Sequence, residues 1–332
     1  MKTQSDIQPT VAYVVVCWNN RDLLEECLES IKAQDYPSKK IIIVDNDSKD
    51  DSVAFIKKSY PEVELVELDK NQGFAIGNNR GIDKALEDKD VAYVALVNTD
   101  ATLSPNWTSV LVEAAERKPL GATFQSVTLD YYDHNIIDST HIYIARNGQA
   151  TQGSWRRPVP GGYDVAPQKV FGCNAAAVVI SRRFIEAQPF EDFFDKTMWM
   201  YLEDVDVAAR ATVMGWSNYV VPGARAYHMG SASSGKNPGF SLYMTFRNNS
   251  GLLIKNMPFK LLFKMAPALI RGDIDTIIHL RRTGRSAAIK KVLKGRLVAL
   301  LYLPIFLRKR SQLSHLRNVD NGYLWQLMCR GF

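Results

Sequence analysis

Short apolar runs alternate along the first half of the chain with segments whose apolar residues recur every three or four positions. The runs lie at Val11–Cys17, Lys40–Val44, Val63–Leu68 and Val91–Val97. Runs of this length that are rich in β-branched residues predict strands, and strands this apolar are covered on both faces. The pattern therefore predicts an α/β fold with a mostly parallel, Rossmann-like sheet flanked by helices.

Helical patterns fill the intervals between the apolar runs. Their apolar spacing predicts helices that cover about residues 23–31, 52–57, 76–86, 105–117 and 203–214. Residues 130–168 show neither pattern and are rich in Gly, Pro and Asn, which is typical of binding loops in a compact domain. Order resumes over residues 170–180 and in a short strand at residues 218–221. We expect the later segment Ser231–Phe240 to close over a ligand and exclude water.

Polar side chains follow three of the predicted strands at the points where the strands end. They are Asn19, the pair Asp45 and Asn46, and the pair Asn98 and Asp100. Asn and Asp are also common in turns for purely local reasons, so each tip alone favours turn chemistry. Because open parallel sheets bind ligands beyond the carboxyl ends of their strands, the three tips together favour a binding site.

The chemistry of these tips suits a sugar nucleotide with a divalent cation. Mg²⁺ and Mn²⁺ prefer oxygen ligands and retain waters, so one or two carboxylates and a diphosphate can hold either ion. Asp45 and Asn46 could hydrogen-bond the imide edge of a pyrimidine base. The first predicted strand is followed by WNNRDLL in place of G-x-G-x-x-G, which excludes a dinucleotide-dependent dehydrogenase, and no P-loop motif is present.

Residues 11 to about 250 resemble a family 2 glycosyltransferase of the GT-A fold, and most closely its rhamnosyltransferase-like branch. The matching segments, in family order, are VVVCWNNRDLLEECLESIKAQ, IIIVDNDSKDDS, NQGFAIGNNRGI, NTD, GCNAAAVVISR, WMYLEDVDVAAR and YHMGSASS. The resemblance implies an inverting transferase that uses Mg²⁺ or Mn²⁺ and a nucleotide-activated sugar. The chain departs from the family at Asn98, which stands where the usual D-x-D motif has its first acid.

The resemblance assigns the metal site and the catalytic carboxylates. It makes Asp100 the first metal ligand and His228 a further one, although a lone histidine is as often a packing residue. At the start of the predicted helix, we expect Asp204 to act as the general base that deprotonates the acceptor hydroxyl, with Glu203 orienting the acceptor or the sugar. Carboxylates at a helix start are also favoured by the helix dipole alone.

The remaining expected contacts surround these groups. Trp199 and Tyr201 are predicted to line the acceptor subsite, although both could be core residues. Closely spaced glycines that begin at Gly73 let backbone amides approach a phosphate or ribose. The full set of predicted donor-binding residues is Cys17, Asn19, Asp45, Asn46, Gly73, Asn79, Asn98 and Asp100.

The basic residues are concentrated at the C-terminal end of the chain. From Leu252 onward there are 16 Lys/Arg and 3 Asp/Glu, which leaves 25 basic and 32 acidic residues in the preceding part, although the whole chain carries a net charge of +6. Cations set among Leu, Phe and Tyr suit an element that lies on a membrane surface, whereas nucleic acid would need only the charge. A helical subdomain or an oligomer contact is the alternative interpretation.

These observations predict a GT-A catalytic domain over residues 1–250 and a basic, mainly helical extension over residues 251–332. Within the first domain, residues 11–125 form the expected nucleotide-binding half and residues 126–250 the acceptor-binding half. Four scattered cysteines and a polar start of the sequence favour a cytoplasmic protein, peripheral at the inner membrane face.

The best functional hypothesis is transfer of L-rhamnose from dTDP-rhamnose to a lipid-linked or polysaccharide acceptor in cell-surface glycan synthesis. A UDP-sugar, or another hexose or galactofuranose-type donor, is the same-fold alternative. A catalytically silent binding module, which Asn98 slightly favours, belongs to a different class.

Overall fold

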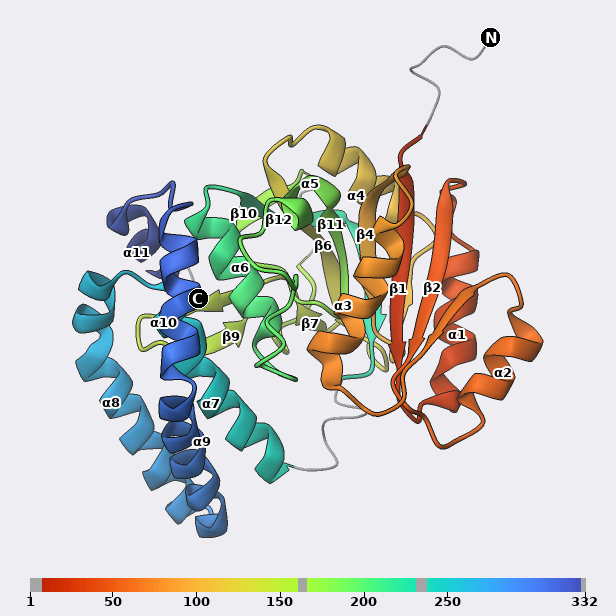
Figure 1. The fold of residues 1–332 in the computed structure, drawn as a ribbon. Helices are drawn as coiled ribbons and strands as arrows, with labels where there is room; N and C mark the ends of the chain where they lie inside the picture. Colours follow the sequence, from red (N-terminus) through yellow and green to blue (C-terminus); the bar gives the residue numbers. More distant parts are fainter. Residues whose placement is uncertain (1–7, 161–165, 231–237, 330–332) are drawn as a thin grey trace.

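The computed structural model describes residues 8–160, 166–230 and 238–329, and its centre is a ten-stranded sheet (Figure 1). The strands of this sheet are Thr10–Cys17 (β1), Lys39–Asp45 (β2), Glu64–Glu67 (β3), Val91–Val97 (β4), Ala101–Leu103 (β5), Gly121–Asp130 (β6), Ile137–Ser139 (β7), Gln168–Val170 (β10), Ala177–Ser181 (β11) and Ser217–His228 (β12). A separate two-stranded sheet pairs Ile142–Ile144 (β8) with Ala150–Gln152 (β9).

The helices alternate with the strands through the first half of the chain and follow one another at its end. They are Arg21–Lys32 (α1), Ser52–Ser59 (α2), Gly73–Leu86 (α3), Trp107–Glu116 (α4), Arg182–Glu186 (α5), Glu203–Val213 (α6), Pro238–Asn256 (α7), Phe259–Arg282 (α8), a 3₁₀ turn Ser286–Ala288 (η1), Ile289–Leu301 (α9), Leu303–Ser314 (α10) and Asn321–Cys329 (α11).

The large sheet runs in the order β10-β12-β6-β11-β4-β1-β2-β3, with β5 beside β12 and β7 beside β6. Its two longest pairings, β6 with β12 and β1 with β2, are parallel, and so are β1 with β4 and β2 with β3. Val14 lies opposite both Ile42 of β2 and Leu96 of β4, so β1 is an interior strand. Strand β11 runs antiparallel between β4 and β6. The predicted α/β fold with a mostly parallel sheet is confirmed.

Alternate residues of β1 supply the cores on the two faces of the sheet. Tyr13 belongs to the core that α1 and α4 cover, together with Trp107 of α4. Val14 faces the opposite core, with Ile82 of α3 and Val207 of α6. Because successive strand residues point to opposite faces, one uninterrupted apolar run fills both cores. This explains why the sequence of β1 is an uninterrupted run of hydrophobic residues from Val11 to Cys17.

The structure differs from the predicted elements in the second half of the sheet. Residues 170–180, expected as one ordered segment, divide between β10 and β11, and β6 was not predicted. The short strand expected at residues 218–221 continues as β12 to His228, with a register shift between Val221 and Arg225. Residues 231–237 of the predicted closing loop lie outside the described residues.

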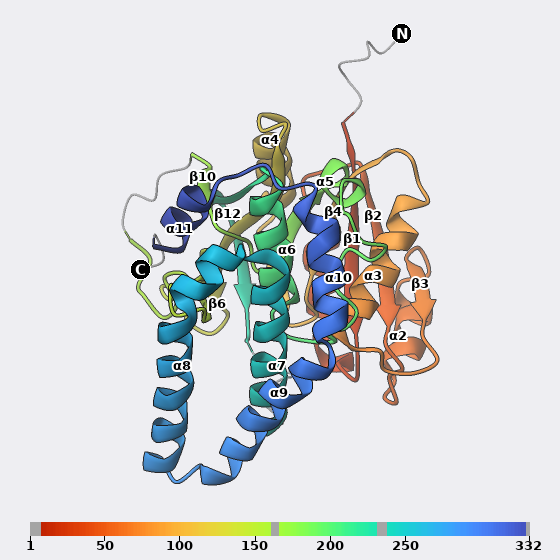
Figure 2. The same ribbon diagram turned by 60° about the vertical axis from the view of Figure 1, so that its left-hand side comes forward.

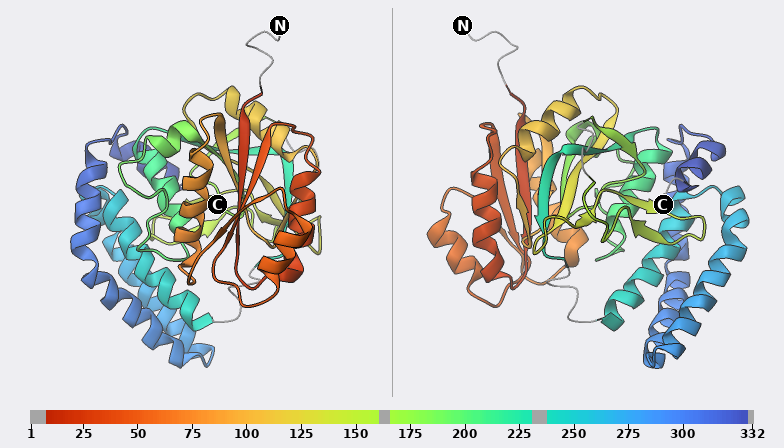
Figure 3. Two further views of the ribbon diagram at one scale, coloured as in Figure 1. Left: turned by 45° about the vertical axis from the view of Figure 1, so that its right-hand side comes forward. Right: turned by 180° about the vertical axis from the view of Figure 1, so that it is seen from behind.

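Helices α7 to α10 form a layer on the side of the molecule away from β1, β2 and β3 (Figures 2 and 3). Helix α7 crosses residue 250, where the sequence suggested a domain boundary, and its Leu252 and Leu253 share a core with Val205 of α6. Within the described parts of the chain, no helix combines the length and the apolarity that crossing a bilayer requires.

Candidate functional site

A cleft of about 390 Å³ opens at the carboxyl ends of β1, β2 and β4, bounded on its other side by the start of α6 and by Thr245 of α7. Eight predicted site residues line it: Asn46, Gly73, Asn98, Asp100, Tyr201, Glu203, Asp204 and His228. Of the residues that the structure describes, the five other predicted ones do not line it: Cys17, Asn19, Asp45, Asn79 and Trp199. The strand tips and the carboxylates of α6 therefore meet at one site.

Strand pairing brings His228 and Asp100 together. The antiparallel pairing of β12 with β5 sets His228 opposite Ala101, and the backbone N–H of Met229 donates to the carbonyl of Asp100 at 3.0 Å. In this arrangement Nε2 of His228 lies 3.2 Å from Oδ1 of Asp100, and Nδ1 lies 2.9 Å from Oδ2 of Asp138 on β7. The imidazole therefore sits between two carboxylates.

These two carboxylates control the charge of the imidazole. Burial alone lowers the pKa of His228, but the hydrogen bonds to Asp100 and Asp138 outweigh burial and raise that pKa to about 10. In the metal-free protein both ring nitrogens are therefore protonated, and each donates to a carboxylate.

The donor atoms of Asp100 and His228 fit a divalent cation. Two adjacent ligands of an octahedral Mg²⁺ or Mn²⁺ ion lie roughly 3 Å apart, which matches the 3.2 Å between Oδ1 of Asp100 and Nε2 of His228. Among the described residues, no cluster of three or more His, Cys, Asp or Glu side chains could hold a metal ion. An ion here would take its other ligands from a diphosphate and from water, as Mg²⁺ commonly does.

Asp45 ends β2 and Asn46 follows it, and the two side chains make different hydrogen bonds. The amide of Asn46 donates to the carbonyl of Gly73 at 3.2 Å and accepts from the backbone N–H of Gln72 at 2.8 Å, so it holds the glycine turn at the start of α3. Asp45 accepts from the backbone N–H of Ser48 through Oδ2. Its buried Oδ1 has no hydrogen-bond partner in the described structure. This orphaned oxygen is the kind of acceptor that a ligand N–H satisfies.

Two of the predicted donor-binding residues support neighbouring segments, and a third is buried. Asn19 accepts from the backbone N–H of Lys49 at 2.6 Å and so fixes the loop after β2. Asn79 is buried and exchanges two 2.8 Å hydrogen bonds with the backbone of Phe194. Cys17 is a buried thiol, and burial raises its pKa.

Glu203 and Asp204 begin α6 and face the cleft. Burial raises the pKa of Asp204 to about 6, partly opposed by the backbone N–H groups of Val205 and Ala175. Burial and the adjacent charge of Asp204 raise the pKa of Glu203 to about 8. The pKa of Glu203 is raised further than that of Asp204, so of the two carboxyls Asp204 loses its proton at the lower pH and is the better candidate to accept one from an acceptor. Oε2 of Glu203 is buried and has no hydrogen-bond partner among the described residues.

The segment that leads into α6 is strained. Trp199, Tyr201 and Leu202 have φ values of 61°, 70° and 66°, in the left-handed region that non-glycine residues rarely occupy. Each such residue costs on the order of 1–3 kcal/mol, so the surrounding structure must hold it. One support is α3: the N–H of Ala75 donates to the carbonyl of Trp199 at 3.0 Å. Gly73 allows this approach, since a Cβ there would lie 2.6 Å from Trp199.

The other support is Asn248 of α7. Its amide group donates to the carbonyls of Met198, Met200 and Tyr201 at 2.8, 2.9 and 2.7 Å. The neighbouring Arg247 donates to the carbonyl of Met198 at 3.0 Å, and its Nε donates to Oδ1 of Asn248 at 2.9 Å, which sets the orientation of that amide. A residue far along the chain therefore holds the backbone that presents Glu203 and Asp204.

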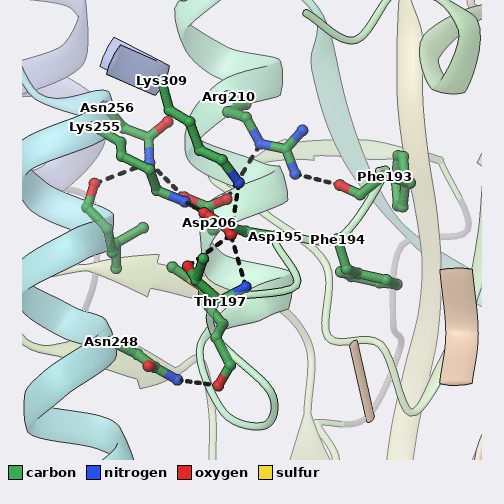
Figure 4. A network of polar contacts seen from close by, with 12 residues as sticks. Phe193, Phe194, Asp195, Thr197, Asp206, Arg210, Asn248, Lys255, Asn256 and Lys309 are labelled. Atoms are coloured by element: carbon green, nitrogen blue, oxygen red, sulfur yellow. Dashed lines mark hydrogen bonds and ion pairs between the residues drawn. The ribbon is translucent and has the colours of Figure 1, made fainter. Parts of the chain in front are cut away.

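A buried ionic network joins α6 to the C-terminal helices (Figure 4). Lys255 of α7 pairs with Asp195 and lies 3.0 Å from Oδ1 of Asp206, and Lys309 of α10 lies 2.7 Å from Oδ1 of Asp195. Asn256 donates to Oδ1 of Asp206 at 2.7 Å. Lys255, Asp195 and Asp206 are fully buried, so their charges depend on one another.

Sequence reasoning missed several residues of this site. Trp18 lines the cleft directly after β1, and its place beside Asn19 was a signal that could have found it. Asp138 lies in the segment that showed no regular pattern, and Asn248 lies in the middle of a helix. Nothing local in the sequence marks either residue as part of a site.

Known proteins resemble this chain in both sequence and fold. The family described as "Glycosyl transferase family 2" matches residues 13–187. A curated relative, the N-acetylglucosaminyl-diphospho-decaprenol L-rhamnosyltransferase of Mycobacterium tuberculosis, is 26% identical over 254 residues, which cover 72% of this chain and 81% of the relative.

Two solved structures share the fold. GalNAc-T7 with UDP, GalNAc and Mn²⁺ has a TM-score of 0.58 at 13% identity, and 75% of this chain aligns with 48% of it, so this chain spans about half of that protein. The mannosyltransferase PcManGT of Pyrobaculum calidifontis, in complex with GDP-Man and Mn²⁺, has a TM-score of 0.53 at 16% identity, covering 95% of this chain and 89% of its own. At these identities the likeness concerns the fold alone.

Proposed function

Because this chain belongs to glycosyl transferase family 2, we propose that it transfers a sugar from a nucleotide donor to an acceptor hydroxyl with inversion at the anomeric carbon. The observation that carries this proposal is the meeting of Asp204 with Asp100 and His228 around one cleft. A base and a diphosphate site on opposite sides of a sugar are what a single displacement requires. The pKa of Asp204, which is raised less than that of Glu203, supports its assignment as the base.

In the proposed reaction Asp204 takes the proton of the acceptor hydroxyl as that oxygen bonds to the anomeric carbon. The bond from this carbon to the donor diphosphate breaks, and the diphosphate leaves with the electron pair. Glu203 is neutral at pH 7 and donates a hydrogen bond to the sugar or the acceptor through its unpartnered carboxyl. Tyr201 would line the acceptor side of the cleft. Trp199 packs against Gly73 and so supports the segment that carries Tyr201.

Asp100 and His228 would hold Mg²⁺ or Mn²⁺ at the donor diphosphate. When bound, such an ion supplies positive charge that stabilises the leaving diphosphate. Asn98 lines the cleft beside Asp100 and offers an amide oxygen where the family motif has a carboxylate. A pyrimidine base would lie at the end of β2, where Asn46 lines the cleft and the adjacent Asp45 carries an orphaned oxygen.

For the donor we propose dTDP-L-rhamnose, and for the acceptor a lipid-linked glycan intermediate of cell-surface polysaccharide or cell-wall synthesis. The name of the mycobacterial relative specifies an L-rhamnosyltransferase and a decaprenol-linked acceptor, which supports the choice of rhamnose and of a lipid-linked acceptor. A UDP-linked hexose or galactofuranose is the alternative donor. Such an acceptor is anchored in a bilayer, so we propose that the enzyme works at the inner face of the cell membrane, with its basic C-terminal helices toward the lipid.

The test is a donor screen with purified protein and Mn²⁺, which measures release of the nucleoside diphosphate. Each dTDP- and UDP-sugar is paired with a short-chain polyprenyl-diphospho-N-acetylglucosamine acceptor. We expect release with dTDP-rhamnose, and a loss of at least about 100-fold in the Asp204→Asn variant with donor affinity kept. Asp90→Asn is the matched control, because Asp90 is exposed on the loop before β4, at the opposite end of that strand.

Two results would count against the proposal. No release from any donor, together with measurable nucleotide affinity, would favour a binding module without turnover. Equal turnover in the wild-type protein and the Asp204→Asn variant would remove Asp204 from the role of base. Release from a UDP-sugar alone would keep the transferase assignment and replace the donor.

A further inference from the structure

The C-terminal helices carry apolar side chains that the protein itself does not cover. On α8 these are Phe259, Phe263, Ile270, Ile274 and Ile278, and Phe263 is 79% exposed. At 100° per residue, all five fall within an arc of roughly 100°. The buried side chains of α8 are Leu261, Met265 and Leu280, on the other side of the helix. A stripe this wide on one helix face is normally buried against another surface.

Helix α9 repeats the arrangement. Leu293, Leu297, Leu300 and Leu301 are each more than half exposed, with Leu301 at 75%, and also share an arc of roughly 100°. Helix α9 faces the body with Val292, Gly295 and Ala299. We call the two exposed stripes together the docking surface. Scattered exposed apolar residues are ordinary, whereas contiguous ones of this kind mark a site of interaction.

The excess of basic residues around these stripes indicates that the partner is anionic. Residues 259–301 contain ten Lys/Arg and two Asp, Asp273 and Asp275. Both carboxylates are already paired with arginines, Asp273 with Arg296 and Asp275 with Arg271. Eight cations therefore remain without an acidic partner in this segment. Lys260 and Lys264 border the stripe of α8, and Lys290 and Lys294 border that of α9.

We propose that the docking surface lies in the headgroup region of an anionic phospholipid bilayer. A helix with an apolar stripe bordered by lysines binds such a surface by burying the stripe among the acyl chains while the cations meet the phosphates. A second copy of this chain is a poorer partner, because two such surfaces would bring together sixteen cations that have no acidic partner among the described residues.

The position of α9 connects this surface to the cleft. Gly295 packs against the backbone of α7, where an added Cβ would lie 2.7 Å from the carbonyl of Tyr243 and 3.1 Å from the N–H of Arg247. Between these residues, Thr245 of α7 lines the cleft, and Asn248 one turn later holds the segment before Asp204. Only α9 and α7, which pack directly on each other, therefore lie between the stripe of α9 and the site. This placement deepens the proposed function, on which it rests, because it brings the cleft beside a bilayer-anchored acceptor.

The test measures sedimentation of the full chain with vesicles, in the absence of nucleotide and acceptor. Vesicles of phosphatidylcholine alone are compared with vesicles of equimolar phosphatidylcholine and phosphatidylglycerol. We expect binding to the anionic vesicles, weakened about fivefold for each cation removed in Lys290→Glu, Lys294→Glu. The double variant Leu297→Ser, Leu301→Ser should lose about tenfold for each leucine.

Matched controls lie on the catalytic body. Leu120→Ser removes a leucine that is 65% exposed, and Lys58→Glu with Lys89→Glu reverses two exposed lysines. These controls should bind anionic vesicles as the wild-type protein does. Equal binding to both vesicle types, or equal losses in the controls, would overturn the proposal. A dimer that only the leucine variant loses, with vesicle binding unchanged, would also overturn it and make the surface an interface between copies.

Turnover separates this proposal from the function on which it rests. With a short-chain acceptor dispersed in detergent, the docking-surface variants should keep nucleoside diphosphate release while they lose vesicle binding. A protein that binds anionic vesicles as expected, and yet shows no turnover with any donor, would keep the docking surface and reject only the transferase assignment.

Discussion

Nδ1 of His228 lies 2.9 Å from Oδ2 of Asp138, so the imidazole is oriented by a carboxylate that does not line the cleft. The opposite ring nitrogen faces Asp100. A histidine that donates one N–H to a carboxylate is fixed in ring orientation and becomes a stronger metal ligand through its other nitrogen. Asp138 is therefore a positioning residue for the proposed metal site.

Replacing Asp138 with asparagine should weaken Mn²⁺ binding. Loss of a carboxylate behind a metal-binding histidine typically reduces metal affinity 10- to 100-fold. Titration of Mn²⁺ by electron paramagnetic resonance in the presence of dTDP measures this affinity without turnover. Asp133→Asn, on the exposed loop before β7, is the control and should leave the affinity unchanged. An unchanged affinity in the Asp138 variant would remove this residue from the metal site.

The pH profile of turnover should report Asp204. A general base must be deprotonated, so activity should rise with pH through about 6, where Asp204 ionises. Glu203 is still protonated at that pH because its pKa is raised to about 8. Glu203→Gln therefore replaces one neutral group with another and should leave the acidic limb of kcat/KM in place. If the fall of kcat/KM at acidic pH disappeared in this variant, the group that ionises near pH 6 would be Glu203 and not Asp204.

Asn248 should affect the chemical step more than donor binding. Asn248→Ala removes the donors to three carbonyls of the strained segment before α6, so Glu203 and Asp204 lose their fixed positions. A displacement of about 1 Å at a catalytic group can cost 100-fold in rate, so we expect kcat to fall by one to two orders of magnitude.

Asn249→Ala is the matched control for Asn248, since Asn249 donates instead to the carbonyl of Gly148, away from this segment. Donor affinity, measured by calorimetry, should stay within about twofold in both variants. A fall in kcat of equal size in the control would mean that general disturbance of α7 accounts for the loss.

The apolar runs were sufficient to predict the parallel half of the sheet because burial on both faces demands uninterrupted hydrophobicity. Val11–Cys17 and Val91–Val97 are such runs, and their ends locate Asp100. The family resemblance added Asp204 and His228, which line the cleft with Asp100. Asp204 and His228 meet Asp100 through contacts between distant segments, which the periodicity of the local sequence cannot predict.

The residues that the sequence did not reveal act through such contacts. Asp138 reaches His228 only because β7 pairs with β6, next to β12, and three-residue strands carry too few positions to show alternation. Asn79 looked like a donor ligand beside the glycines but is buried against the backbone of Phe194. An amide suits a ligand and a buried carbonyl equally well, so only the fold separates the two uses.

Lys255 should contribute strongly to stability because its buried ammonium pairs with both Asp195 and Asp206. Without it, each carboxylate keeps a single cation, Lys309 for Asp195 and Arg210 for Asp206. Leaving a buried charge wholly uncompensated costs about 3–5 kcal/mol. Since Lys309 and Arg210 remain, Lys255→Met should lower the free energy of unfolding in urea by more than about 1 kcal/mol but by less than this full amount. Lys84→Met, which removes an exposed pair with Glu87, should change it by less than about 1 kcal/mol. Equal losses in the two variants would contradict a special role for the buried network.

The same network makes stability depend on pH. Burial raises the pKa of Asp195, but Lys255 and Lys309 outweigh burial and hold that pKa well below its usual range. A carboxyl whose pKa is depressed in the folded state stabilises the fold above its unfolded pKa of about 4, and this contribution is lost as the pH falls below that value. The wild-type protein should therefore lose stability below about pH 4 more steeply than Lys255→Met, in which the depression is smaller. Parallel stability curves for the two proteins, measured by urea unfolding between neutral and acidic pH, would show that Lys255 does not set the ionisation of Asp195.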